Sequence, residues 1–154
     1  MQSAYKVFAY LIAALVVLQA MMIAFAIAGL GVWVDKDGGV LDKASMESDL
    51  EFTGVLGFAI HGMNGMMLIP AVALIFLIIS FFAKVPGGVV WAAVTLLLVV
   101  VQITLGLLGH ENPYFGMIHG LNALILFSVA VMAGKRVSTA TTAASASATT
   151  HAAA

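Results

Sequence analysis

The sequence contains no cysteine and very little charge. Only 8% of its 154 residues are Asp, Glu, Lys or Arg, whereas soluble domains carry about 25%. Without cysteine, the chain has no disulfide, zinc–thiolate site, iron–sulfur cluster or thiolate nucleophile. A formal net charge of −1 provides no basic surface for a phosphate backbone, so we expect no nucleic-acid partner. So little charge also excludes an ordinary cytosolic enzyme and a disordered regulator.

Apolar residues, in contrast, are abundant. They make up 63% of the chain, and the mean hydropathy is +1.14. Four uncharged stretches exceed the roughly 20 residues that a helix needs to cross a bilayer core, and none alternates as a strand would. Because a spanning backbone must satisfy its own hydrogen bonds, we expect helices. The sequence predicts an all-α integral membrane protein, an antiparallel four-helix bundle formed by residues 1–136. The expected helices cover about 7–34, 52–83, 86–109 and 114–134, with an outer loop at 35–51.

Charged residues divide between the two sides of this bundle. Four of the six basic residues flank the helices on the side of the termini, and two lie in the outer loop. Because basic residues favour the cytoplasmic side, we expect a multi-pass cell-membrane protein with both termini cytoplasmic. The basic residues on the termini side are Lys6, Lys84, Lys135 and Arg136. The acidic residues, all on the other side, are Asp35, Asp37, Asp42, Glu47, Asp49, Glu51 and Glu111.

The C-terminal segment has a different composition. Residues 137–154 are mostly Ser, Thr and Ala, a low-complexity composition that cannot bury a core. We predict a disordered tail. His151 lies in this tail, and we assign it no role.

A short motif occurs twice. The pattern H-G-[ML]-N-[GA] begins at His61 in the second expected helix and at His119 in the fourth. The helix that precedes each copy contains a glutamine, Gln19 or Gln102, with glycines further outward. The chain therefore resembles two helical hairpins of the same design, related by an approximate two-fold axis along the membrane normal.

The two histidines are the strongest candidates for function. Ionisable side chains within a membrane span are costly and usually face the bundle interior or a functional path. Both helices enter from the outer side, so His61 and His119 are expected at similar depth, facing each other across the bundle axis. Two neutral imidazoles in this arrangement suit the axial positions of haem b. We therefore predict both as metal ligands.

Small and amide residues accompany these histidines. Glycines at helical spacing from each histidine leave room for a porphyrin edge, although they also let helices pack closely. Asn64 and Asn122, one turn inward, are candidates to bond a haem propionate or to orient an imidazole. The candidate cofactor-binding residues are His61, His119, Asn64, Asn122, Gly57, Gly65, Gly116 and Gln102.

The segment Val101-Gln102-Ile103-Thr104-Leu105-Gly106, followed by an outer loop and by His119, resembles one half of a haem A synthase. The resemblance implies a half-bundle fold with His61 and His119 as axial haem ligands and the long first loop outside. In that family a Glu stands three residues before the second-helix His and an Arg directly after it. Here those positions hold Phe58 and Gly62, and the cysteine pair and the second bundle are absent. The resemblance thus implies haem binding, and we do not expect synthase activity.

Three functions compete. The first is a haem b protein that transfers single electrons near the outer face, with a quinol or a respiratory-chain membrane complex as partner and possible homo-oligomerisation. The second is a non-redox accessory subunit whose His and Asn residues only hold the bundle together. The third is copper handling by the histidines with nearby Met63, Met66 or Met117, because thioethers suit Cu(I). His110 and Glu111 are a further candidate pair for an outer-surface metal or for proton transfer.

Overall fold

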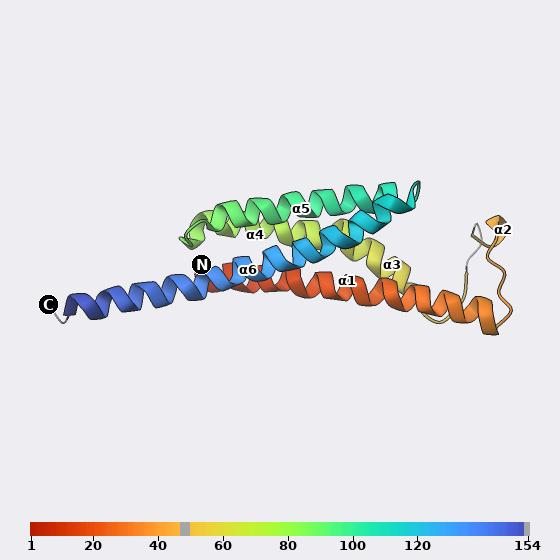
Figure 1. Ribbon diagram of the computed structural model, residues 1–154, viewed down its shortest axis with the longest axis horizontal. Coiled ribbons are helices and arrows are strands. Elements are labelled where there is room, and N and C mark those ends of the chain that lie inside the picture. Colours follow the sequence, from red (N-terminus) through yellow and green to blue (C-terminus); the bar gives the residue numbers. More distant parts are fainter. Residues whose placement is uncertain (47–49, 153–154) are drawn as a thin grey trace.

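The computed structural model describes residues 1–46 and 50–152, with side chains described for residues 1–45 and 50–137. Within these ranges every regular element is a helix (Figure 1). Four helical stretches are long and apolar enough to cross a membrane, which confirms the predicted all-α four-helix membrane bundle. Their bounds are Gln2–Lys36, Leu56–Ala83, Gly88–Gly109 and Pro113–Val137. The predicted loop acids Glu47 and Asp49 lie outside the described residues.

Seven helical elements make up these stretches and one connection. The second span consists of three consecutive elements, and a single α-helical turn lies in the first long loop. Apart from the C-terminal end of α6, the helix ends differ from the predicted ones by at most five residues. The elements are α1 (Gln2–Lys36), α2 (Lys43–Met46), α3 (Leu56–Met63), η1 (Asn64–Leu68), α4 (Ile69–Ala83), α5 (Gly88–Gly109) and α6 (Pro113–Ala152).

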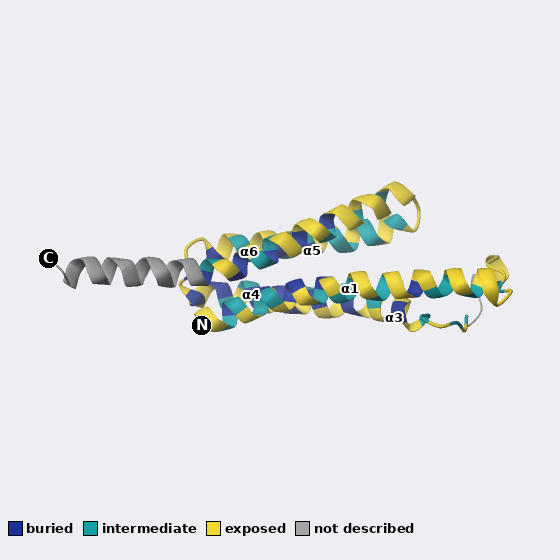
Figure 2. Cartoon of the chain, turned by 60° about the horizontal axis from the view of Figure 1, so that its bottom comes forward, coloured by how far each residue is buried: buried dark blue, intermediate teal, exposed yellow. Residues whose placement is uncertain are grey.

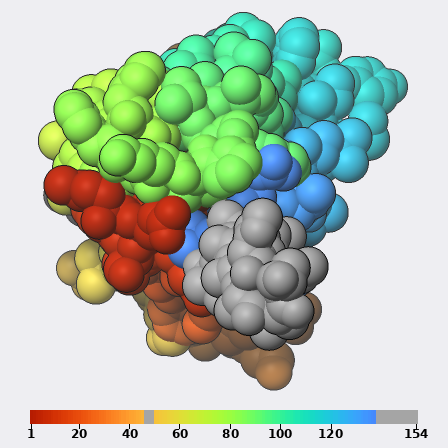
Figure 3. Space-filling model, turned by 90° about the vertical axis from the view of Figure 1, so that its left-hand side faces the viewer, coloured from red at the N-terminus to blue at the C-terminus, as the bar shows by residue number. Residues whose placement is uncertain are grey.

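The four spans form a closed ring in which α1 packs against α4, α4 against α5, α5 against α6, and α6 against α1. The N-terminus and the α4–α5 turn lie together at one end, here called the termini end (Figure 3). The opposite end, called the loop end, carries the α1–α3 connection and the α5–α6 turn. In the α4–α5 turn, Lys84 and Gly87 adopt left-handed conformations with φ of 54° and 69°. This tight turn makes α4 and α5 antiparallel neighbours, as predicted.

Among the described residues, the contiguous hydrophobic core fills the termini half of the bundle, and the buried Ala26 and Gly57 lie outside it at the α1–α3 contact. At this end the Tyr5 hydroxyl donates to the Gly88 carbonyl at 3.2 Å. Among described residues of α5 and α6, none beyond Asn122 toward the loop end is buried, and Figure 2 shows exposed positions prevailing there. The core residues furthest toward the loop end are Val16, Ile69, Val99 and Leu126.

Toward the loop end the spans separate into two pairs. Helix α3 packs on α1, and the pair α1/α3 diverges from the pair α5/α6 (Figure 2). Contact of α1 with α3 and with the residues just before it depends on glycine. A Cβ at Gly57 would overlap the backbone oxygen of Met22, and one at Gly29 would overlap that of Thr53, which precedes α3. Close approach of these two backbones therefore requires residues without side chains.

The buried positions of the two halves are in register. Tyr5, Ala9, Ile12 and Val16 of α1 correspond to Gly88, Ala92, Thr95 and Val99 of α5, each pair being 83 positions apart. The second helices of the two halves also correspond at a constant spacing as far as the asparagine. Beyond it, this spacing is shorter by one residue. His61 and Asn64 stand 58 positions before His119 and Asn122, whereas Ile69, Ala73 and Phe76 stand 57 positions before Leu126, Ala130 and Ala133.

This extra residue of the first half lies in η1, a π-helical turn. A π-turn accommodates one inserted residue within an α-helix while the helix continues on both sides. The insertion therefore leaves the core positions of α4 in register and changes the local geometry between Asn64 and Leu68.

Two segments lie outside the four spans: the C-terminal part of α6 and the long loop between α1 and α3. Where the sequence predicted a disordered tail from residue 137, the structure describes α6 as continuing to Ala152. This segment is rich in Ala, which has the highest helix propensity, and contains no Gly or Pro.

In the long loop, the Asp42 carboxylate caps α2 by accepting the Ser45 N–H at 2.7 Å. The backbone and side-chain hydrogen bonds from Ser45 lower the pKa of Asp42 below its usual value.

Candidate functional site

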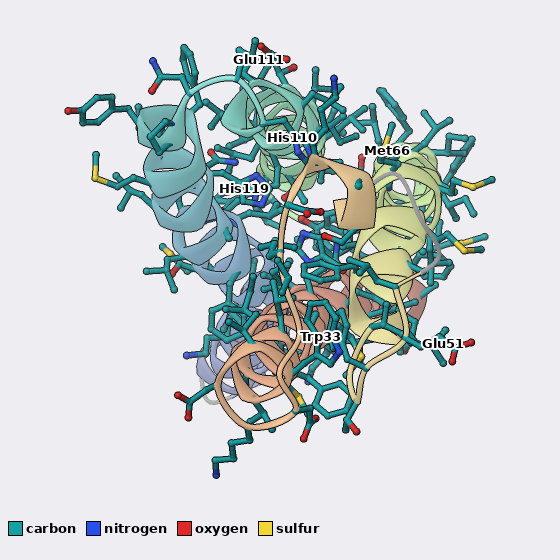
Figure 4. All side chains as sticks on the ribbon, turned by 90° about the vertical axis from the view of Figure 1, so that its right-hand side faces the viewer. Trp33, Glu51, Met66, His110, Glu111 and His119 are labelled. Atoms are coloured by element: carbon teal, nitrogen blue, oxygen red, sulfur yellow. The ribbon has the colours of Figure 1, made fainter. Side chains whose placement is uncertain are left out.

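The two repeated histidines lie next to each other between the helical pairs. His61 belongs to α3 and His119 to α6, and their ring centroids are 6.2 Å apart with an angle of 54° between the ring planes. Both side chains are partly buried. Figure 4 shows His119 directed from α6 into the region between the two pairs. The fold thus brings together two residues that are 58 positions apart in the chain, as the internal repeat predicted.

Each imidazole is held by a backbone carbonyl of the neighbouring helix. Nδ1 of His61 lies 3.1 Å from the Gln19 carbonyl oxygen, and Nδ1 of His119 lies 3.0 Å from the Gln102 carbonyl oxygen. A carbonyl can only accept, so each Nδ1 carries the proton and donates it. The lone pair of each neutral ring is then on Nε2. This is how proteins fix the tautomer and orientation of metal-binding histidines.

In the second half, the amide side chains complete this arrangement. Asn122 donates through Nδ2 to Gln102 Oε1 at 2.6 Å and to the Leu98 carbonyl at 3.0 Å. With its oxygen engaged by Asn122, the Gln102 amide directs its nitrogen at His119, and Nε2 of Gln102 lies 3.1 Å from Nε2 of His119. Gln102 therefore contacts His119 twice, through its carbonyl and through its side chain.

In the first half, equivalent residues are bonded differently. The Gln19 amide donates to the His61 carbonyl at 2.9 Å, and Asn64 reaches the Leu15 carbonyl at 3.5 Å. Gln19 Oε1 and Asn64 Oδ1 are buried without a hydrogen-bond partner. Asn64 is also the first residue of the π-turn. The one-residue insertion thus coincides with the place where the bonding of the two halves differs.

The repeat extends further than the histidine motif. Residues 15–19 read L-V-V-L-Q and residues 98–102 read L-V-V-V-Q. Leu15 and Leu98 supply the carbonyls that accept from the two asparagines, and the glutamines supply the carbonyls that hold the imidazoles. Comparing these two pentapeptides in the sequence could have shown that Gln19 and Gln102 occupy equivalent positions in the two halves.

The candidate glycines have different surroundings. Gly57 contacts α1 at Met22 and Ala26, and a Cβ at Gly65 would lie 2.5 Å from Nε2 of Gln19. These two glycines permit close packing with α1. A Cβ at Gly116 would meet nothing within 4 Å, so only this one of the three borders open space.

Other candidate residues lie outside the histidine cluster. Met63, Met66 and Met117 are 66%, 55% and 67% exposed. His110 and Glu111 are exposed at the α5–α6 turn. Among the described side chains, no group of three or more His, Cys, Asp or Glu residues could hold a metal ion.

The chemistry available to the site is that of two neutral imidazole donors. Two rings that coordinate one metal from opposite sides, with metal–nitrogen distances of about 2 Å, have centroids roughly 6 Å apart. The observed 6.2 Å is close to this spacing, while Nε2 of His119 is directed at the Gln102 amide in this structure. Two protein donors are too few for a tetrahedral metal site, which needs four ligands. They are sufficient for a metal whose other ligands belong to a planar cofactor.

Comparison with known protein families, with curated proteins and with solved structures gives no match. The interpretation of the site therefore depends on its own residues and geometry.

Proposed function

We propose that this chain is a membrane haem b protein in which His61 and His119 are the two axial ligands. The observation that carries this proposal is the 6.2 Å separation of the imidazole rings, each with Nδ1 donating to a backbone carbonyl and a lone pair left on Nε2. Iron with both histidines bound would have no open position for a substrate, so its chemistry in that state would be one-electron transfer.

The surroundings support a flat, largely apolar cofactor. At the candidate residue Gly116 an added Cβ would meet nothing within 4 Å, and the core does not extend into the loop half of α5 and α6. In this proposal the two histidines hold the metal, the Gln19 and Gln102 carbonyls keep both rings oriented, and the small residues leave room for the porphyrin.

The resemblance to half of a haem A synthase supports the same architecture. Synthase activity is not part of the proposal, because Phe58 stands where that family has a carboxylate. The basic residues at the termini end favour a cytoplasmic location of this end. The histidines would then lie near the outer face of the cell membrane, with a quinol or a respiratory-chain membrane complex as the electron partner.

An absorption spectrum tests the proposal. The full chain, purified in detergent from haem-replete cells, is measured after oxidation and after reduction with dithionite. We expect a strong Soret band and a sharp reduced α-band, the signature of low-spin haem b. A colourless protein that also fails to bind added hemin would reject the proposal.

One observation favours a second candidate, an accessory membrane subunit. Each Gln–His–Asn set already links two helices by hydrogen bonds without any cofactor. In this alternative, the His61→Ala variant loses thermal stability and the wild-type protein has no visible absorption. Copper handling is less well supported, because the nearby methionines are more than half exposed; metal analysis of the purified protein distinguishes it.

A further inference from the structure

The two histidines differ in what occupies Nε2, the nitrogen available to a metal. Nε2 of His119 accepts from the Gln102 amide at 3.1 Å, and the hydrogen bond from Asn122 to Oε1 keeps that amide in place. Among the described residues, no hydrogen bond to Nε2 of His61 is found, since the Gln19 amide donates to the His61 carbonyl instead.

From this difference we infer that Gln102 is a positioning residue that competes with the metal for Nε2 of His119. The inference rests on the proposed haem function. For a metal at this site, Nε2 of His61 would be free and Nε2 of His119 would be hydrogen-bonded to Gln102. His61 would then be the first and permanent ligand, and His119 would coordinate only after the Gln102 side chain had moved away.

The same contact makes His119 the exchangeable ligand. When His119 leaves the metal, its Nε2 regains the hydrogen bond from Gln102, which offsets part of the lost coordination energy. The released imidazole also remains oriented, because Nδ1 stays on the Gln102 carbonyl. The coordination position on the His119 side then becomes accessible to a small neutral diatomic ligand, a property that a rigid bis-histidine site lacks.

Two symmetry-related variants test the inference. Gln102→Leu removes the competing amide, and Gln19→Leu removes its equivalent, which does not contact Nε2 of His61. Cofactor-free protein in detergent is titrated with hemin and followed at the Soret band. Loss of one competing hydrogen bond should tighten low-spin binding about three- to tenfold in Gln102→Leu, while Gln19→Leu should not bind more tightly than the wild type.

Carbon monoxide probes the exchange directly. The dithionite-reduced wild type should form a CO complex, and Gln102→Leu should require several-fold more CO for half-saturation. Gln102→Ile, a second variant without the N–H and without a metal-binding atom, should behave like Gln102→Leu. Equal hemin and CO affinities in wild type and both variants would overturn the inference and leave the haem proposal intact.

A measurement without cofactor separates the two proposals. Diethyl pyrocarbonate acylates neutral imidazole nitrogen, and peptide mass spectrometry reports each histidine separately. In the cofactor-free wild type, His61 should react faster than His119, and Gln102→Leu should accelerate His119 alone. Unchanged His119 reactivity would overturn the role of Gln102, whereas absence of hemin binding in the wild type would instead reject the haem function.

Discussion

Gly106 on α5 lies directly against the imidazole of His119 on α6. A Cβ at Gly106 would be 3.1 Å from Cε1 and 3.2 Å from Nδ1 of that ring. Gly106→Ala must therefore displace the ring by a few tenths of an ångström and strain its bond to the Gln102 carbonyl. We expect a weaker low-spin α-band in Gly106→Ala and loss of the band in the bulkier Gly106→Val, both measured by reduced absorption spectra.

The matched control is Gly120→Ala, next to His119 on the same helix. A Cβ there would meet nothing within 4 Å, so the spectrum should not change. Equal spectra in Gly106→Val and wild type would show that the ring position does not determine cofactor binding.

Removing either axial candidate gives the most direct prediction. His61→Ala and His119→Ala should each abolish low-spin haem, because one remaining imidazole leaves the metal without its second strong ligand. His110→Ala, at the exposed α5–α6 turn, should retain the wild-type spectrum. An unaltered low-spin spectrum in either inner variant would rule that residue out as a ligand.

The α1–α3 contact predicts a difference in stability between two glycine variants. A Cβ at Gly57 would overlap the Met22 backbone oxygen, so Gly57→Ala should destabilise the protein by about 1–3 kcal/mol through overpacking. Gly62→Ala, five residues later in open space, should be neutral or stabilising by up to about 1 kcal/mol. Thermal unfolding in detergent, followed by helical circular dichroism, measures both. A Gly57→Ala variant as stable as Gly62→Ala would contradict the close packing.

The π-turn predicts tolerance to a deletion. Removing Met67 from η1 leaves the spacing found in the second half, where Asn122 and Leu126 lie on a regular helix. The core of α4 should keep its register, and the variant should remain folded and monodisperse. Removing Val100 from α5, which has no π-turn, should rotate Gln102 by roughly 100° relative to the core and disrupt the fold. Size-exclusion chromatography and thermal unfolding compare the two, and equal damage from both deletions would argue against an inserted residue in η1.

Because the chain has no cysteine, single cysteines can test its orientation. Val40→Cys places a thiol in the exposed long loop and Gln2→Cys places one at the termini end. With both termini cytoplasmic, an impermeant maleimide should label Val40→Cys in intact cells and label Gln2→Cys only after permeabilisation. The reverse pattern would place the histidines near the cytoplasmic face.

Hydropathy was sufficient to predict the four spans, because a backbone in lipid has few alternatives to a helix. The Lys84–Gly87 turn and the juxtaposition of His61 with His119 were also predictable, the latter because a repeated motif implies equivalent positions in equivalent helices. The sequence did not settle the role of Gly57 and Gly65. Small residues suit both a cofactor edge and a helix contact, and only the position of Met22 and Gln19 shows that packing with α1 is what they permit here.

Other features were beyond the sequence for physical reasons. The π-turn at Asn64 becomes visible only when the buried positions of both halves are aligned, since the residues within it have ordinary helical preferences. The side-chain hydrogen bonds of Gln19 and Gln102 differ although both residues occupy equivalent positions, because a side-chain amide can donate to any of several nearby acceptors. The carbonyls that hold the imidazoles are backbone groups, which composition and spacing of side chains do not report.

The common register of the two halves also bears on ancestry. Two segments that bury equivalent positions 83 residues apart are what a gene duplication and fusion would leave behind. The ancestor would have been a two-helix protein that assembled as a homodimer, with each subunit contributing one identical histidine across the symmetry axis. In such a homodimer neither histidine could differ from the other. A single chain is free of that restriction: its first half has one residue more, in η1, and its two histidines have different surroundings.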